Sequence, residues 1–228
     1  MKKIIVILAA AAMVCSMASC GGGRALKSEN DTLSYALGTD FGTSLKQLLE
    51  QVDTDVNMDV FYAAVEDVLA DEAVLSREEA FGFLRNYFNV VVPQRALEAS
   101  QAYLAEIEKE DGVKKTESGL LYRINREGSD KKATQNTDQV KVCYEGKLKD
   151  GSVFDSSYER GDTVSFALNQ VIKGWTEGMK LVGEGGEIEL WIPSELGYGQ
   201  RAPQQIGPNQ ALHFKVELIE VIPTAEEK

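Results

Sequence analysis

The sequence predicts an α+β protein, in which a helical region is followed by an antiparallel β-sheet. Between about Asp31 and Glu110, apolar residues recur every three or four positions, as they do along one face of a helix. After Gly119 the pattern changes to short runs of alternating apolar and polar residues, which are separated by turn residues and are typical of strands. Helices followed by strands are the pattern of an α+β chain.

Residues 1–19 have the pattern of a secretory signal peptide, which is removed from the mature protein. Lys2 and Lys3 precede an apolar run that is too short to span a bilayer comfortably. The segment "MASC" then resembles a bacterial lipobox, which predicts cleavage before Cys20, lipidation of its thiol and a tether over residues 20–30. An ordinary signal peptide with an incidental cysteine is the alternative. The expected location is the bacterial cell envelope, as a periplasm-facing outer-membrane lipoprotein.

Charge and cysteine content exclude several classes of function. The formal net charge is −12 and the acidic residues are spread along the chain, so nucleic acid would be repelled. No glycine-rich phosphate-binding turn stands where a strand would lead into a helix. Once Cys15 is cleaved off and Cys20 is lipidated, Cys143 is the single remaining thiol, so no disulfide is expected.

The first helix is marked by one apolar face, which consists of Leu33, Leu37, Phe41, Leu45 and Leu48. Gly38 and Gly42 lie on or near this face. They either let another helix approach closely or are two helix-weakening residues without a packing role. The segment "VFYAAVEDVL" predicts a second, short helix.

A third and longer helix is expected to begin after Ser76, because Glu79 stands three residues later as the partner in a capping box. Pro93 should kink or split this helix, because proline lacks the backbone N–H that a helix interior requires. The apolar positions continue beyond what a lone helical hairpin could cover, so a partner chain is expected.

Four alternating runs predict the strands, namely "GLLYRINREG", "DQVKVCYEGKLKDG", "GEIELWIPS" and "ALHFKVELIEVI". In the last run, Leu212 and Phe214 share one face, and the only histidine of the chain, His213, is expected to be exposed on the other. A role for His213 as metal ligand or general base is therefore not favoured. Without it no Ser/His/Asp or Cys/His set can be built, and no metal or cofactor is implied.

Four segments in the β part carry a resemblance to a known family. In their order and spacing, "KVCYEGKLKDGSVFDSSYERG", "QVIKGWTEG", "IPSELGYG" and "IGPNQALHFKVEL" resemble the FKBP family of peptidyl-prolyl cis–trans isomerases, over roughly Gly119 to Ile222. The resemblance implies an antiparallel sheet that curls around one short helix, which would begin near Gln170 and carry Trp175. It also implies that Trp175 is the floor of an apolar pocket for a proline ring.

The same resemblance assigns the other site residues one by one. The pocket walls would be Tyr144, Phe154, Arg160, Val164, Val171, Ile206 and Phe214. The catalytic groups would be the Ile172 backbone N–H and the Tyr198 hydroxyl, which would bind substrate carbonyls, and Asp155. The Asp155 carboxylate would either face the carbonyl before proline or position Tyr144 and Arg160.

Catalysis of this kind requires no nucleophile. The barrier to peptide rotation is about 18–20 kcal/mol and arises from amide resonance, so the reaction breaks no covalent bond. A dry apolar pocket disfavours the charge-separated planar amide, and preorganised donors stabilise the twisted state. The expected substrates are proline-containing unfolded or exported polypeptides. The resemblance also implies a macrolide of the rapamycin type as a ligand.

Three positions depart from the family pattern. Val164 stands where many members have a phenylalanine, and Gly207 replaces the first proline of a common "IPPN" turn. Cys143 replaces a frequent histidine. The first change is expected to widen the pocket and weaken macrolide binding, and the second to loosen the loop over the pocket.

The helical region resembles the amino-terminal dimerisation domain of macrophage-infectivity-potentiator-like FKBPs, through "LSYALGTDFGTSLK", "LSREEAF" and "GVKKTESGLLYRI". This resemblance implies a homodimer with interlocked helices, and a division into a dimerisation domain at 31–115 and an isomerase domain at 116–224. Two functions remain open at this stage. The protein is an envelope isomerase that assists the folding of exported proteins, or it is a holdase-like chaperone or binding module with a vestigial isomerase pocket.

Overall fold

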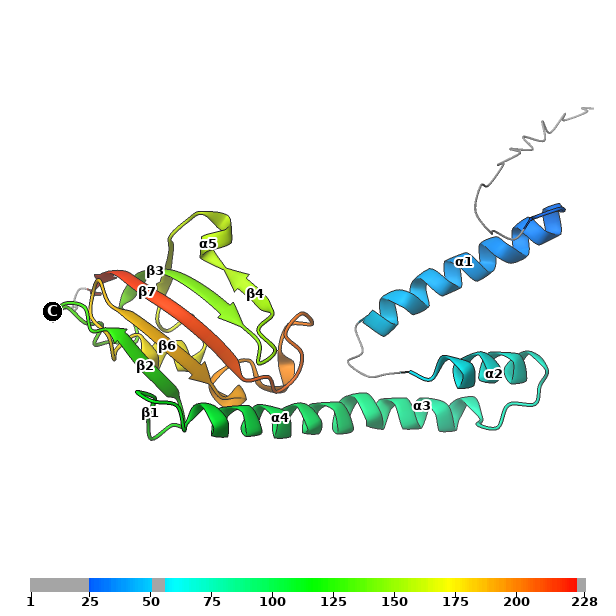
Figure 1. The fold of residues 1–228 in the computed structure, drawn as a ribbon, viewed down its shortest axis with the longest axis horizontal. Coiled ribbons are helices and arrows are strands. Elements are labelled where there is room, and N and C mark those ends of the chain that lie inside the picture. Colours follow the sequence, from blue (N-terminus) through cyan, green and yellow to red (C-terminus); the bar gives the residue numbers. More distant parts are fainter. Residues whose placement is uncertain (1–24, 51–55, 225–228) are drawn as a thin grey trace, which may run out of the picture. The chain divides into compact units, whose positions relative to one another are not determined.

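The structure is a computed structural model that describes residues 25–50 and 56–224. It confirms the predicted α+β class, with helices preceding an antiparallel sheet (Figure 1). The expected signal peptide and Cys20 lie outside the described residues. The chain divides into two compact units, with the boundary between Phe61 and Tyr62. None of the helices in the two described ranges is long and apolar enough to cross a membrane.

The first unit contains helix α1 (Glu29–Glu50). Its first turn is capped by Ser28, whose hydroxyl accepts a hydrogen bond from the Asp31 amide at 3.0 Å. The predicted apolar face is exposed: Leu37 retains 65% of its accessible surface and Phe41 58%. Gly38 and Gly42 also face open space, because a Cβ added to either would meet nothing within 4 Å.

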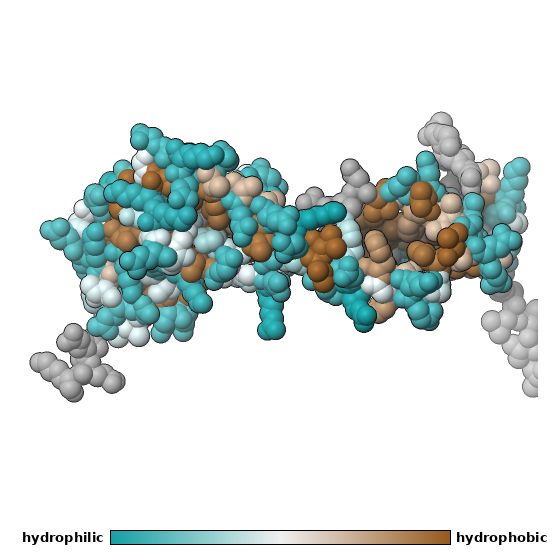
Figure 2. Space-filling view, turned by 90° about the horizontal axis from the view of Figure 1, so that it is seen from below, coloured by the Kyte–Doolittle hydropathy of each residue, from teal (hydrophilic) through white to brown (hydrophobic). Residues whose placement is uncertain are grey.

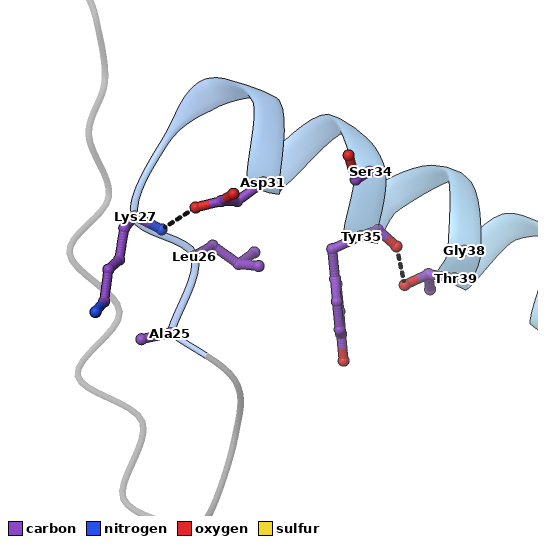
Figure 3. Close-up of a pocket in the computed structure, with 8 residues that line it drawn as sticks. All are labelled: Ala25, Leu26, Lys27, Asp31, Ser34, Tyr35, Gly38 and Thr39. Atoms are coloured by element: carbon purple, nitrogen blue, oxygen red, sulfur yellow. Dashed lines mark hydrogen bonds between the residues drawn. The ribbon is translucent and has the colours of Figure 1, made fainter.

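A depression beside the N-terminal part of α1 is lined by Leu26, Tyr35 and Gly38, among others (Figure 3). The Leu26 and Tyr35 side chains both lie on this side of the helix (Figure 3). A hydrogen bond from the Lys27 amide to the Asp31 carboxylate, 2.9 Å long, holds the segment that precedes the helix. The depression contains none of the residues that were assigned to the isomerase site. Helix α2 (Met58–Leu69) follows and crosses the unit boundary.

The long helix of the second unit consists of three segments, α3 (Arg77–Asn86), a π-helical turn η1 (Tyr87–Val91) and α4 (Val92–Ile107). The predicted capping box is present, because Ser76 and Glu79 bond each other's backbone amides. Pro93 interrupts the regular α-helix as expected. The widened turn lies directly before it, with the Val92 amide bonded to the Tyr87 carbonyl five residues earlier.

Seven strands form one antiparallel sheet in the order β1-β2-β6-β7-β3-β4, and β5 also pairs with β3. They are β1 (Lys114–Lys115), β2 (Leu121–Arg126), β3 (Gln139–Lys147), β4 (Val153–Ser156), β5 (Val164–Ala167), β6 (Glu187–Ile192) and β7 (Leu212–Ile222). The four runs expected from the sequence correspond to β2, β3, β6 and β7. Strands β1, β4 and β5 were not predicted.

The sheet encloses the short helix α6 (Lys173–Gly178), which confirms the fold that the resemblance implied. The helix carries Trp175 and begins three residues later than expected. The glycines on either side of Trp175 explain how closely it packs. A Cβ at Gly174 would lie 2.5 Å from Ile192 Cγ2, and one at Gly178 would lie 2.6 Å from Leu190 Cδ2. Only glycine at these positions allows the helix to approach strand β6 this closely.

The C-terminal end of α4 packs on the outer face of the sheet, at β2 and β6. Ile107 from the helix, Leu121 from β2 and Trp191 from β6 form a second buried cluster there. Figure 1 shows α4 running beside the sheet and ending next to β1 and β2. This cluster joins the long helix to the sheet within a single unit.

His213 corrects one expectation, because it is not exposed. Its imidazole ring stacks on Trp191, with ring centroids 4.9 Å apart and planes 2° from parallel. Its Nε2 lies 3.0 Å from a Glu189 carboxylate oxygen, and the side chain retains only 23% of its exposure. Strand alternation correctly placed His213 on the outer face, but it could not reveal that Trp191 and Glu189 cover that position.

Candidate functional site

The indole of Trp175 lies within a cluster of aromatic rings, called here the aromatic cluster. Its members are Tyr144 from β3, Phe154 from β4, Phe166 from β5, Trp175 from α6 and Phe214 from β7. Trp175 is 4% exposed. The rings of Tyr144, Phe166 and Phe214 all meet it nearly at right angles, at centroid distances of 5.2–5.6 Å. This edge-to-face arrangement is favourable for aromatic pairs.

The indole N–H of Trp175 is buried and has no hydrogen-bond partner in the described part of the chain. An unpaired buried donor is unfavourable by itself. Residues that only fill a core seldom carry such a group, so the position of Trp175 is consistent with the predicted role as the floor of a site.

Asp155, Tyr144 and Arg160 form one hydrogen-bonded network beside this cluster. The Tyr144 hydroxyl donates to the Asp155 carboxylate at 2.6 Å, and Arg160 Nη1 donates to the other carboxylate oxygen at 2.6 Å. Arg160 Nη2 also donates to the Tyr144 hydroxyl at 3.1 Å. These bonds are compatible with one of the two roles predicted for Asp155, which is to position Tyr144 and Arg160.

The charges in this network set its protonation state. Burial acts to raise the pKa of Asp155, but the hydrogen bonds from Tyr144 and Arg160, together with the Arg160 charge, outweigh it and lower the pKa below the usual value. Burial and the adjacent carboxylate raise the pKa of Tyr144. At neutral pH the site therefore holds an ionised Asp155 and a protonated Tyr144.

Besides the Trp175 indole, two further donors near the cluster have no acceptor within the described part of the chain. One is the backbone N–H of Ile172, the residue that caps the N-terminus of α6. The first amides of a helix have no partner inside the helix, so this group is available to a ligand. The other is the Tyr198 hydroxyl, on a side chain that is 40% exposed. Burial and the negative charge of Asp155 raise the pKa of Tyr198, so its hydroxyl remains protonated.

The remaining predicted wall residues adjoin the same core. Phe214 and Ile206 are buried at 4% and 5% exposure, and Phe154 meets Phe214 edge-on at 5.5 Å. Val164, Val171 and Ile172 are partly buried against the core. Val171 also lines a depression beside α6, together with Thr176 and Lys180.

Sequence reasoning missed two residues of this region. Phe166 contacts both Tyr144 and Trp175, and its strand alternation with Val164 two residues earlier could have revealed it. The other is Ser157, which is fully buried. Its hydroxyl accepts a hydrogen bond from the Tyr144 amide at 2.8 Å and thereby holds that residue in place. No sequence signal pointed to Ser157.

The chain resembles known proteins along almost its whole length. Residues 130–219 match the family described as FKBP-type peptidyl-prolyl cis-trans isomerase, and residues 30–124 match the domain amino terminal to it. The probable FKBP-type peptidyl-prolyl cis-trans isomerase FkpA of Neisseria meningitidis is 42% identical over 200 residues, which cover 82% of this chain and 73% of that protein. The peptidyl-prolyl cis-trans isomerase Mip of Coxiella burnetii is 35% identical, over 86% of this chain and 88% of that protein.

Solved structures agree with these matches. The crystal structure of FkpA from Escherichia coli superimposes with a TM-score of 0.65 and 36% identity, over 88% of this chain and all of that one. The fold, the aromatic cluster and the sequence similarity all indicate the same family. The chain therefore belongs to the FKBP-type peptidyl-prolyl cis-trans isomerases.

Proposed function

We propose that this isomerase acts on proline-containing segments of unfolded, exported polypeptides, with the proline ring seated on Trp175. The observation that carries the proposal is the placement of two donors without acceptors, the Ile172 N–H and the Tyr198 hydroxyl, beside a buried aromatic cluster. A substrate carbonyl bound by each donor would fix the peptide on both sides of the rotating bond.

The proposed mechanism depends on the difference in charge separation between the planar and the twisted amide. The planar amide is stabilised by resonance and by charge separation, which apolar surroundings disfavour. Contact with the rings of Tyr144, Phe214 and Trp175 therefore favours the twisted state, in which the charge separation is smaller. The two donors are already in place to bind substrate carbonyls, so no solvent has to reorient during the rotation. Asp155 keeps Tyr144 and Arg160 in place.

We further propose that the mature protein begins at a lipidated Cys20 and is held at the envelope of a bacterium. The lysines, apolar run and "MASC" segment support this part of the proposal. A homodimer through α1 is proposed as well. It is supported by the exposed apolar face of this helix, by the open space beside Gly38 and Gly42, and by the depression lined by Leu26 and Tyr35.

A holdase function remains the second candidate, because the helices expose many large apolar side chains. Figure 2 shows hydrophobic surface over the helical part of the chain, and five of these residues are on α3 and η1, namely Phe81, Phe83, Leu84, Phe88 and Val90. Binding at such surfaces would keep an unfolded chain soluble, but it would not rotate a peptide bond.

Refolding of a test protein whose slow phase is limited by a native cis proline separates the two candidates. Uncatalysed proline isomerisation takes about 10–100 s at 25 °C. The isomerase is expected to shorten this phase when it is present at a small fraction of the refolding chain, whereas a holdase would raise the yield and leave the rate unchanged. An unchanged slow phase at every enzyme concentration would contradict the proposed substrate class.

A further inference from the structure

Helix α4 reaches the loop that precedes β7 through a buried serine. Ser100 is 2% exposed, and its hydroxyl donates to the Asn209 carbonyl at 2.9 Å and accepts from the Ala211 amide at 2.9 Å. A serine inside a helix more often points to solvent or bonds a carbonyl of its own helix. Here both of the hydrogen bonds go to a segment more than a hundred residues away in the sequence.

Asn209 receives this contact and extends it in two directions. Its side-chain Nδ2 donates to the Pro93 carbonyl of α4 at 3.0 Å, and its backbone amide donates to the Gly199 carbonyl at 2.9 Å. Its φ of 52° lies in the left-handed region, which asparagine tolerates better than most residues do. Asn209 thus bonds both the long helix and the turn that follows Tyr198.

These bonds lie next to groups assigned to the isomerase site. Gly199 directly follows Tyr198, and Ile206 stands three residues before Asn209 on the same loop. Ala211 leads into β7, which carries Phe214 of the aromatic cluster. The loop itself contains Gly207 at a φ of +77°, a conformation that proline cannot adopt. Pro208 follows Gly207 in this loop, and the bonds made by Ser100 and Asn209 tie the loop to α4.

We infer that Ser100 and Asn209 are positioning residues for the isomerase, which hold the Tyr198 turn and the Ile206 loop in their binding conformation from helix α4. The inference rests on the proposed assignment of Tyr198 and Ile206 to the substrate site. It gives the long helix a role in turnover in addition to any role in dimerisation. Neither residue touches the substrate.

The test uses the full mature chain with three substitutions, assayed on a proline-containing tetrapeptide well below the unfolding temperature. Ser100→Ala removes both of the serine bonds. Asn209→Gly removes the side-chain bond to Pro93 and keeps a residue that is suited to positive φ. Ile107→Val is the matched control, because it loosens the same helix–sheet contact at the Trp191 cluster, away from the loop.

Ser100→Ala and Asn209→Gly are each expected to lower kcat/KM about two- to tenfold, the range that corresponds to about one neutral hydrogen bond. The loss should be mainly in KM, because a loosened loop spends less time in the conformation that binds substrate. Ile107→Val should lower the Tm and leave kcat/KM unchanged. Faster hydrogen exchange at the amides of Asn209 and Ala211 in the Ser100→Ala protein would identify the loop as the part that moved.

Two results would overturn the inference. In one, both loop variants keep wild-type kcat/KM; in the other, Ile107→Val lowers it as much as they do. Tyr198→Phe is assayed alongside as an independent check of the site. If Tyr198→Phe retains full activity while Ser100→Ala lowers kcat/KM, the assignment of Tyr198 fails, and the positioning role of α4 then rests on the Ile206 loop alone.

Discussion

Two glycines allow Trp175 to be buried against strand β6. Gly174 and Gly178 stand one residue before and three residues after it, and each faces a fully buried side chain of the sheet, Ile192 and Leu190. Protein interiors are close-packed, so an added methyl group here is expected to meet neighbours that have little room to move. The short segment "KGWTEG" therefore supplies the Trp175 ring and also the two glycines that let helix α6 pack closely on strand β6.

Gly178→Ala is expected to destabilise the protein by about 1–3 kcal/mol, as overpacking of a dense core commonly does. The new Cβ would lie 2.6 and 2.7 Å from the two Cδ atoms of Leu190. Urea denaturation measures the effect. Gly82→Ala is the control, because a Cβ there meets nothing within 4 Å and alanine favours a helix by roughly 0.5–1 kcal/mol. Equal stability of Gly178→Ala and the wild type would contradict the packing described here.

For single residues, the sequence predicted those that a motif identifies by residue type and by spacing along the chain. Trp175, Tyr144 and Phe214 lie together as the resemblance implied. It could not predict Ser157, because a buried serine that bonds a distant amide leaves no local pattern. His213 was misjudged for a related reason, since its burial depends on Trp191 of a neighbouring strand.

At the scale of elements, His213 is partly buried on the outer face of β6 and β7, and charged side chains surround it. Glu189 lies beside His213, and Arg123 extends over Trp191 at 5.2 Å and bonds Glu189. Burial lowers the pKa of His213 below its usual 6.5. Glu189 opposes this change, while the charges of Lys147 and Arg123 add to it. The folded protein therefore favours the neutral imidazole.

The pH dependence of stability follows from this lowered pKa. Below about pH 6.5, the unfolded chain binds a proton at His213 more readily than the folded protein does. The free energy of unfolding should therefore decrease as the pH falls from about 6.5 to the lower pKa of the folded state. His213→Gln should lose this part of the dependence, which urea denaturation at pH 7.5 and 5.5 would measure. The same decrease in both proteins would show that other groups cause it.

The longest elements were predicted best, because they repeat one pattern over many residues. The helical region before the sheet and strands β2, β3, β6 and β7 were expected, as was the interruption at Pro93. Strands β4 and β5 have four residues each, and both pair with β3, at opposite ends of it. Four residues are too few for alternation to distinguish a strand from a loop. Their pairing is set by the rest of the sheet.

At the scale of the whole molecule, the apolar face of α1 is expected to hold two chains together. Leu37→Glu combined with Phe41→Glu places charge on this face and should convert a dimer to a monomer. Sedimentation equilibrium at micromolar concentration of the mature chain, with Cys20→Ser to prevent lipidation, measures the change. The substituted chain should keep its activity on a short proline peptide, because neither residue belongs to the aromatic cluster. A monomeric parent chain would contradict the proposed dimer.

The central claim is that rotation of the prolyl bond is catalysed by an apolar floor and hydrogen-bond donors, without a nucleophile. The most direct test is kcat/KM on one proline peptide for Tyr198→Phe, Asp155→Val, Cys143→Ser and His213→Gln. Tyr198→Phe removes one neutral hydrogen bond and should lower kcat/KM about two- to tenfold. Asp155→Val should lower it further, because the carboxylate holds both Tyr144 and Arg160. Cys143→Ser and His213→Gln should retain wild-type values. Loss of turnover in either of these two, with full activity in Tyr198→Phe and Asp155→Val, would contradict the account.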